Sequence, residues 1–108
     1  MTEIKYNIGK YIGQVVNGKA EGKGIRYFND GDRYEGDFKN DKKEGKGIYY
    51  YYNSGNRYEG DWKNGKKEGK GIYYYKNGDR EIGDWKESKE IGKHVILSKN
   101  GEIKTENY

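Results

Sequence analysis

Apolar and polar residues alternate over short stretches of this chain, and pairs such as Asn-Gly separate the stretches. The clearest stretch is 58–80, which reads YEGDWKNGKKEGKGIYYYKNGDR. An alternation with a period of two residues indicates a half-buried β-strand, and an Asn-Gly pair between two such strands favours a tight hairpin turn. We therefore predict two short antiparallel strands in this stretch, joined by a two-residue turn at Asn64 and Gly65.

The same pattern recurs along the chain with a nearly constant period. Tyr-x-Gly begins at Tyr11, Tyr34 and Tyr58, and Glu81 takes the tyrosine position in a fourth, degenerate copy. The steps between these positions are 23, 24 and 23 residues, and the extra residue lies in 53–56, which we predict to be a loop. Insertions confined to loops are typical of a stack of hairpins. The expected units are 11–33, 34–57, 58–80 and 81–103, with a cap strand in 1–10 before them and a tail at 104–108 after them.

The register of the hairpin decides which residues share a face. A two-residue turn would place Trp62 opposite Lys67 and Tyr58 opposite Gly71, and directly opposite residues lie on the same face of a sheet. We therefore expect each large ring to lie over a glycine of the adjacent strand, where no side chain occupies the space.

Short loops at 53–56 and 77–79 would carry this register into the neighbouring units. Neither face is expected to be fully buried. The expected fold is all-β, an elongated single-layer antiparallel sheet of stacked β-hairpins that forms one domain over 1–108. It would contain about eight strands from four repeats and one more near the N-terminus, with a length of about 40 Å. A thin apolar stripe would follow the face opposite the rings, at Ile25, Ile48, Ile72 and Val95.

The composition alone would favour disorder, because 37% of the residues are charged and 31% are hydrophobic. The 13 Tyr, 2 Trp and 2 Phe residues change this interpretation, since they bring large apolar area and recur at a fixed spacing. The net charge of +4 permits an acidic partner without requiring one. No stretch is apolar enough to cross a bilayer or to act as a signal peptide, so we expect a soluble, cytoplasmic protein, with peripheral membrane attachment as the alternative.

Residues for enzyme chemistry are scarce. The chain has one histidine, His94, and no cysteine, so a nucleophile with a base and an orienting group is difficult to assemble. The carboxylates are copied once per repeat, which is typical of a scaffold. The segment 29–32, Asn-Asp-Gly-Asp, resembles the start of a calcium loop, but no Glu follows at the twelfth position, and a turn is the better interpretation. We therefore predict no catalytic activity, no metal site and no cofactor.

The pattern Tyr-Glu-Gly-Asp-Trp at 58–62, followed by Asn-Gly-Lys, Gly-x-Gly and a closing Asn-Gly-Asp, resembles the MORN repeat (membrane occupation and recognition nexus). The resemblance covers 11–103 and is closest in the second and third units. It implies a solenoid of β-hairpins with an aromatic-lined groove, used as a scaffold, in dimerisation or in contact with acidic phospholipids. The family also occurs beside catalytic domains, and this sequence contains no such domain.

The aromatic face is the first candidate site. A single-layer sheet would expose rings that a monomer seldom leaves bare, and rigid Tyr and Trp side chains are favoured interface anchors. Such a face would accept a peptide, a helix or a second copy of the chain. Its residues are Tyr11, Tyr34, Phe38, Tyr49, Tyr51, Tyr58, Trp62, Tyr73, Tyr75 and Trp85.

Lysines around the hairpin turns form the alternative site, for an acidic phospholipid surface. Glu44 and Glu68 interrupt the lysine clusters, and lysines at hairpin tips commonly serve solubility and edge protection. Both interpretations stay open, and nucleic acid is a less favoured partner. The lysines are Lys39, Lys42, Lys43, Lys46, Lys63, Lys66, Lys67 and Lys70.

Two further hypotheses concern association and ligand class. Val95, Ile96 and Leu97 lie near one end of the array, where they could form an end-to-end contact with a second copy. Hairpin repeats rich in Tyr and Gly also build choline- or carbohydrate-binding modules, in which aromatic cages hold a quaternary ammonium. Those modules usually carry Gly-Trp and Trp-Tyr-Tyr runs, and here Trp occurs only in Gly-Asp-Trp.

The fourth unit departs from the pattern at two positions. Glu81 replaces the tyrosine and His94 replaces the second glycine, and the expected register places these two residues opposite each other. One interpretation is a solvated cap, because terminal repeats are normally atypical. The other is a contact that responds to pH near neutrality.

Overall fold

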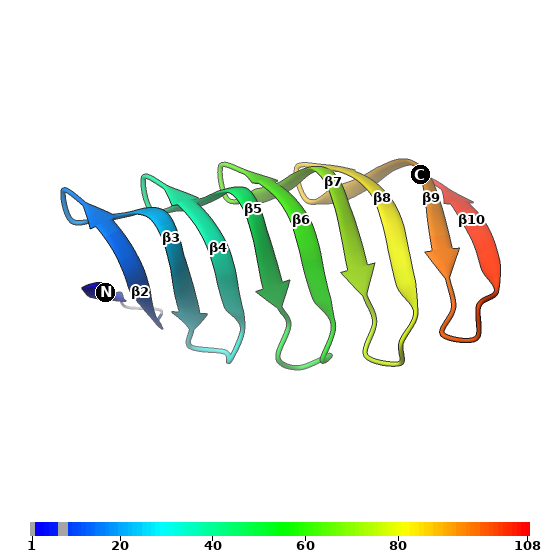
Figure 1. Ribbon diagram of the computed structural model, residues 1–108, viewed down its shortest axis with the longest axis horizontal. Coiled ribbons are helices and arrows are strands. Elements are labelled where there is room, and N and C mark those ends of the chain that lie inside the picture. The colour runs from blue at the N-terminus through cyan, green and yellow to red at the C-terminus, as the bar shows by residue number, and fades with distance from the viewer. Residues whose placement is uncertain (1, 7–8) are drawn as a thin grey trace.

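The computed structural model describes residues 2–6 and 9–108, which form ten β-strands and no helix. All ten strands lie in one antiparallel sheet, in which each strand pairs with the next along the chain (Figure 1). The molecule is elongated, with extents of 47 × 24 × 20 Å. The predicted all-β stack of hairpins is confirmed. The strands are β1 (Thr2–Tyr6), β2 (Gly9–Val16), β3 (Lys19–Phe28), β4 (Arg33–Lys39), β5 (Lys42–Tyr50), β6 (Arg57–Lys63), β7 (Lys66–Tyr74), β8 (Arg80–Lys86), β9 (Lys89–Leu97) and β10 (Ile103–Asn107).

The cap strand expected in 1–10 is β1, which pairs with β2. Residues 1, 7 and 8 of that cap lie outside the described residues. Within the hairpins, two-residue turns with positive φ at both positions join the strands. At Asn64 and Gly65 the φ angles are 51° and 83°, which is the geometry that matches the twist of the flanking strands. The turn predicted at this position is therefore confirmed.

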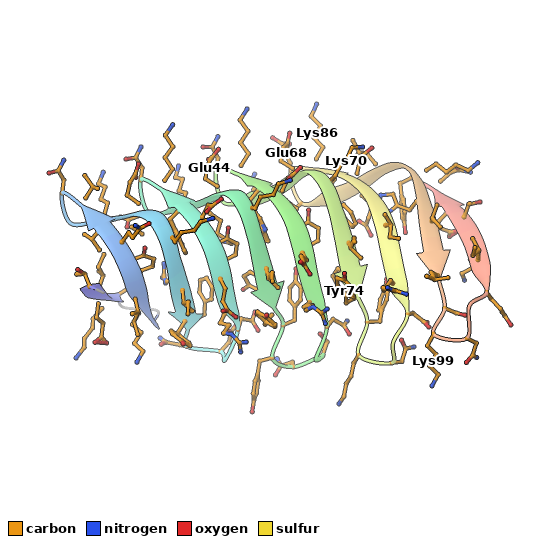
Figure 2. All side chains as sticks on the ribbon, in the orientation of Figure 1. Glu44, Glu68, Lys70, Tyr74, Lys86 and Lys99 are labelled. Carbon is orange, nitrogen blue, oxygen red and sulfur yellow. The ribbon has the colours of Figure 1, made fainter. Side chains whose placement is uncertain are left out.

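Each hairpin turn after the first is bonded to the hairpin before it. The Gly65 N–H donates to the Lys43 carbonyl at 2.9 Å, and the Asn64 N–H donates to the Glu44 carboxylate at 3.2 Å. The turns of the second and fourth units make the same pair of bonds to the units that precede them. Glu44 and Glu68, which interrupt the lysine clusters in the sequence, therefore cap the next turn in the stack (Figure 2).

The register predicted within the hairpin is wrong by two residues beyond Trp62. Trp62 pairs with Lys67 as expected, but Tyr58 pairs with Tyr73 and not with Gly71. The shift arises because the second strand of the hairpin carries a β-bulge that adds residues on one side of the ladder only. The same irregularity occurs in the second unit, so it belongs to the repeat.

Glycine and aspartate together build this bulge. Gly69 has a φ of 91°, which favours glycine, and the Asp61 carboxylate accepts the Lys70 N–H at 3.3 Å across the bulge. Because the register moves by two residues, an even number, every side chain stays on its expected face. The face assignment is therefore right although the pairing partners were wrong.

The loops between hairpins are longer than the expected 53–56 and 77–79. They comprise 51–56 and 75–79, because the strands before them end two residues earlier than expected. The pairing between hairpins moves by the same two residues, so that Tyr58 lies beside Tyr49. The shift is again even and leaves the faces unchanged.

One face of the sheet carries the core, and we call it the inner face. Tyr58 is fully buried there, at 0% exposure, and its ring lies over Gly71, where a Cβ would come within 2.2 Å of the Tyr58 Oη. The expected packing of rings over glycines is confirmed, and as expected the inner face is not fully buried, since Tyr75 on it is 38% exposed. The core residues are Tyr11, Ala20, Tyr34, Phe38, Tyr58, Trp62 and Trp85.

The core is continuous through the stack because each buried tyrosine packs on a ring of the next unit. The Tyr34 and Trp62 ring centroids are 5.2 Å apart at 82°, and those of Tyr58 and Trp85 are 5.1 Å apart at 75°. These are edge-to-face contacts, the arrangement that aromatic quadrupoles favour. A single sheet can therefore bury a core without a second layer, since its own rings cover one another.

The C-terminal residues extend the sheet. β10 pairs with β9, so the expectation of a tail at 104–108 is wrong. Val95, Ile96 and Leu97 lie in β9, which is consequently not an edge strand, and the premise of an end-to-end contact through them does not hold. Tyr108 follows Trp85 by one repeat length of 23 residues, which is the signal that could have revealed this extra strand.

Candidate functional site

Five rings on the inner face form a row beside the core. Neighbouring ring centroids along the row are 5.8, 4.7, 5.8 and 5.0 Å apart. Four of these rings are partly buried and Tyr75 is 38% exposed, so this is the part of the inner aromatic surface that a partner can reach. We call it the ring row, and its members are Phe28, Tyr49, Tyr51, Tyr73 and Tyr75.

The repeat spacing and the loops position the ring row. Tyr49 lies near the end of β5, Tyr51 begins the loop that follows, and the same pair recurs one unit later. Each loop is fastened to the next, as shown by the Lys76 N–H, which donates to the Asn56 Oδ1 at 2.8 Å. The rings therefore sit on loops that the stack itself holds in place.

Carboxylates hold two hydroxyls of the ring row. The Tyr49 hydroxyl donates to Asp32 at 2.9 Å, and the Tyr75 hydroxyl donates to Glu81 at 3.2 Å. Burial and the charge of Glu81 raise the pKa of Tyr75 to about 12, and burial with the bond to Asp32 raises the pKa of Tyr49. Both hydroxyls are therefore neutral at physiological pH.

The segment 29–32 is a turn, as predicted. The Phe28 N–H donates to the Asp32 carbonyl at 3.0 Å, and the Asp32 carboxylate accepts bonds from Tyr49 and from the Tyr52 N–H. Both oxygens of the Asp32 carboxylate therefore already accept hydrogen bonds within the protein. Within 2–6 and 9–108, no group of three or more His, Asp or Glu side chains could hold a metal ion. The same residues include no helix long and apolar enough to cross a membrane.

Lys43 and Lys67 lie on the inner face and not with the other turn lysines, which corrects their assignment to an anionic-surface site. The Lys43 Nζ is 5.4 Å from the Trp62 ring centre, and the Lys67 Nζ is 5.0 Å from the Tyr58 ring centre. Burial lowers the pKa of both lysines. The reason for the placement is parity, since Lys67 pairs with Trp62 and therefore shares its face.

The remaining turn lysines divide into two groups. Lys46 and Lys70 lie on the outer face and form ion pairs with Asp61 and Asp84 of the adjacent hairpins. The other four are exposed at the hairpin tips and form no ion pair with any described residue. These four are Lys39, Lys42, Lys63 and Lys66.

The ten aromatic residues expected on one face also divide into two groups. Tyr11, Tyr34, Phe38, Tyr58, Trp62 and Trp85 are buried in the core, and Tyr49, Tyr51, Tyr73 and Tyr75 belong to the ring row. Sequence reasoning missed Phe28. Its signal is the repeat spacing, since 28, 51 and 75 are equivalent positions.

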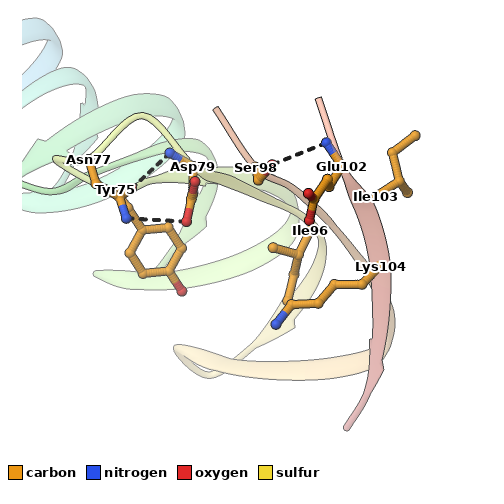
Figure 3. Close-up of a pocket in the computed structure, with 8 residues that line it drawn as sticks. All are labelled: Tyr75, Asn77, Asp79, Ile96, Ser98, Glu102, Ile103 and Lys104. Atoms are coloured by element: carbon orange, nitrogen blue, oxygen red, sulfur yellow. Dashed lines mark hydrogen bonds between the residues drawn. The ribbon is translucent and has the colours of Figure 1, made fainter. Parts of the chain in front are cut away.

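A hollow of about 500 Å³ adjoins Tyr75 at the C-terminal end of the ring row (Figure 3). Ile96 and Ile103 give it an apolar wall, and the Glu102 N–H donates to the Ser98 Oγ at its rim. The hollow offers space for a partner side chain next to the last exposed ring. Its lining is Tyr75, Asn77, Asp79, Ile96, Ser98, Glu102, Ile103 and Lys104.

Comparison with known families gives a match to the repeat itself. The family model for the MORN repeat matches residues 11–33, 34–56 and 58–80, which together make up more than half of the chain. The chain belongs to the MORN repeat family. A search of curated proteins found no match. The three MORN matches end at residue 80, before the unit in which Glu81 and His94 replace the tyrosine and the glycine.

We call the position of the repeat tyrosine in each unit, together with the side chains packed on it, a rung. The rung of the fourth unit, which follows the three MORN repeats, is buried. The expectation of a solvated cap is therefore wrong. Glu81 is 4% exposed and His94 is 0% exposed. Glu81 pairs with Ile96 in the ladder and not with His94, yet the His94 Nδ1 lies 2.8 Å from the Glu81 Oε2. Tyr108, which sequence reasoning missed, donates its hydroxyl to the same Oε2 at 2.7 Å.

The bonds of His94 define its protons. The Nε2 lies 2.8 Å from the Asp84 carbonyl, which only accepts, so the Nε2 carries a proton. The Nδ1 faces a carboxylate oxygen, and this bond requires a further proton, shared between His94 and Glu81. The fourth rung therefore joins a buried carboxylate directly to a buried imidazole. A response of this contact to pH remains a prediction.

Proposed function

We propose that this chain is a non-catalytic interaction module that binds a protein partner along the ring row. The observation that carries the proposal is the partial exposure of neighbouring rings beside a closed aromatic core. Tyrosine is a good interface anchor, because it offers large apolar area with few rotamers to fix and a hydroxyl at its tip. MORN repeats act in protein or membrane interactions, which supports this role.

A comparison of inner-face and outer-face variants tests the proposal. Tyr51→Ala with Tyr73→Ala removes the middle of the ring row, and Tyr50→Ala with Tyr74→Ala removes two rings from the outer face. We expect the inner variant to lose a partner that the wild type and the outer variant retain, measured by pull-down from the native lysate with mass spectrometry. Equal capture by all three proteins would contradict the proposal.

A second copy of the chain is one form that the partner can take. Sedimentation over a range of concentrations would then show a dimer that the Tyr51→Ala and Tyr73→Ala variant lacks. A monomer at high micromolar concentration would exclude the homodimer and leave a different protein as the partner.

Peripheral binding to acidic phospholipids is the second candidate function. Exposed lysines gather at one edge of the sheet, where the hairpin tips lie, and the glutamates between them are bonded to turn N–H groups. Co-sedimentation with vesicles that contain phosphoinositide would test it. Binding should weaken as salt rises and should be lost when Lys39, Lys42, Lys63 and Lys66 are changed to Gln.

A choline- or carbohydrate-binding role has less support. A quaternary ammonium needs free ring faces. The Lys43 ammonium lies within 6 Å of four ring centres, and the Lys67 ammonium lies within 6 Å of three other ring centres. A further cation would be repelled there. Failure to bind choline resin is the expected result.

A further inference from the structure

Three cations lie on the inner face beside the ring row. The Arg26 guanidinium is 3.9 Å from the centre of the Tyr6 ring and 4.9 Å from that of Phe28. Lys43 and Lys67 lie over the rings further along the row. Among residues 2–6 and 9–108, no carboxylate is within ion-pair distance of any of these three side chains.

The outer face of the same strands shows the opposite arrangement. Lys46, three residues after Lys43 in β5, forms an ion pair with Asp61, and the equivalent Lys70 is 3.5 Å from Asp84. The repeat therefore supplies a carboxylate to each of these exposed outer lysines and none to the half-buried inner ones, where the need is greater.

The inner cations lack the partner that their burial calls for. Burial lowers the pKa of Lys43, and the charge of Arg26 adds to this, while at Lys67 the charge of Glu90 partly opposes the effect of burial. The rings compensate only in part through cation–π attraction. The Arg26 Nε is buried without a hydrogen-bond partner. An anion laid on the ring row would pair with Lys43 and Lys67, which lie over its tyrosines.

The spacing of the two lysines indicates the shape of that anion. They hold equivalent positions in β5 and β7, two strands apart, which corresponds to about 10 Å at about 4.8 Å per strand. Residues i and i+7 of an α-helix are about 10.5 Å apart on one face, with i+3 and i+4 between them. In an extended strand, residues on one face are about 7 Å apart, which does not match.

The charge of the row changes sign at its C-terminal end. Glu90 takes the position of Lys43 and Lys67 in the fourth unit. A hollow of about 240 Å³ lies there, lined by Lys67, Glu90 and Glu81 together with aromatic side chains. The first three units therefore present positive charge to a partner, and the fourth presents negative charge.

We infer that the ring row binds an acidic amphipathic α-helix of a partner protein. Its carboxylates at i and i+7 pair with Lys43 and Lys67, its apolar residues between them cover the tyrosines, and its basic end lies at Glu90. The inference rests on the proposed function, because it names the chemistry of the partner for the same surface.

The test uses synthetic helical peptides and fluorescence anisotropy. One peptide carries Glu at i and i+7 with Leu at i+3 and i+4, and its control carries Gln at the two Glu positions. The Glu peptide should bind the wild-type chain about tenfold tighter than the Gln peptide. The preference should shrink when the salt rises from about 0.05 M to about 0.5 M.

Matched lysine variants place the contact. Lys43→Met with Lys67→Met should abolish the preference for Glu and leave binding of the Gln peptide intact. Lys46→Met with Lys70→Met, three residues further along the same strands, should keep the wild-type preference. Circular dichroism of each variant verifies that the sheet is intact.

Several outcomes would overturn the inference. They are equal affinity for both peptides, no binding of either, and an unchanged preference after loss of the inner lysines. A peptide with Glu at i and i+5, or a proline-rich peptide with Glu at every third residue, that binds equally well would exclude the helix. Vesicle binding that needs Lys43 and Lys67, without peptide binding, would assign the cations to lipid. The proposed function fails separately, when Tyr51→Ala with Tyr73→Ala leaves partner capture unchanged.

Discussion

The rung of Tyr58 and the rung of Glu81 fill the same space with different chemistry. In the central rung a single ring covers Gly71, and its hydroxyl donates to the Asp61 carbonyl at 3.2 Å. In the last rung the ring over the glycine comes from the opposite strand, where a Cβ on Gly83 would lie 2.3 Å from the His94 ring. The tyrosine position holds a carboxylate instead.

The difference shows that the repeat conserves a shape and not a set of interactions. The Glu81 carboxylate takes bonds from three side chains, Tyr75, His94 and Tyr108, whereas the central rung needs only Tyr58. Loss of a ring leaves a cavity, but loss of one member of the network leaves a buried charge without its partner. The two rungs should therefore fail in different ways.

The largest expected effect is in the central rung. Tyr58→Ala removes a fully buried ring that touches Trp62 and Trp85, and it should lower the free energy of unfolding by about 3 to 5 kcal/mol. Chemical denaturation measures it. Tyr74→Ala, on the outer face, is the control and should have a clearly smaller effect. Similar losses would mean that the inner face is not the core.

The last rung should respond to exchange of both residues better than to loss of one. His94→Ala removes the only basic side chain among the three bonded to the buried Glu81, and it should destabilise by about 3 kcal/mol. Glu81→Tyr combined with His94→Gly rebuilds the central rung and should lie within about 1 kcal/mol of the wild type, or above it. Denaturant unfolding of both variants decides. A double variant weaker than His94→Ala would show that the rungs are not interchangeable.

Alkaline pH should affect the tyrosine rungs. Burial raises the pKa of Tyr58, and of Tyr75 to about 12, so these groups stabilise the fold fully below pH about 10 and less as the pH rises toward 12. Tyr58→Phe should cost about 1 kcal/mol at neutral pH through its lost hydrogen bonds, and should flatten this decline. Unfolding curves at several pH values measure both, and an unchanged slope would contradict the assignment.

The smallest effect should come from the inner lysines. Lys43→Met removes a half-buried ammonium that has no ion pair in the described structure, and it should leave the stability unchanged or raise it by less than about 1 kcal/mol. Lys46→Met removes an exposed ion pair and should lower the stability of the fold by a similarly small amount. Thermal unfolding of the two variants compares them, and a marked loss in Lys43→Met would assign that lysine a structural role.

The repeat period, the turn at Asn64 and the two faces could be predicted from the sequence because alternation and spacing are local signals. The bulge could not, since its cost and its gain depend on Asp61 reaching across to Lys70. The predicted faces are nevertheless correct, because the bulge shifts the register by two residues, an even number.

The site was predicted less completely than the fold. Closeness in sequence places Lys43 and Lys67 with the turn lysines, whereas pairing of Lys67 with Trp62 places it on the inner face. Exposure is a collective property, so the sequence could not separate the ring row from the core. The role of Tyr108 is not predictable from alternation, because the five residues after the last unit are too short a pattern to indicate a strand.

The hydrogen bonds from each turn to the preceding unit place successive units at a constant spacing along the array. β5 and β7 have the same sequence, KKEGKGIYY, and the turn before each repeated strand is tied backward in the same way. An inserted second copy of 58–80 would therefore pack against units with the same contacting residues as those that flank 58–80 now. Each copy would lengthen the ribbon by about 10 Å and add one inner lysine with its rings. The length of partner helix that the ring row can bind would then increase by one repeat spacing for each added unit.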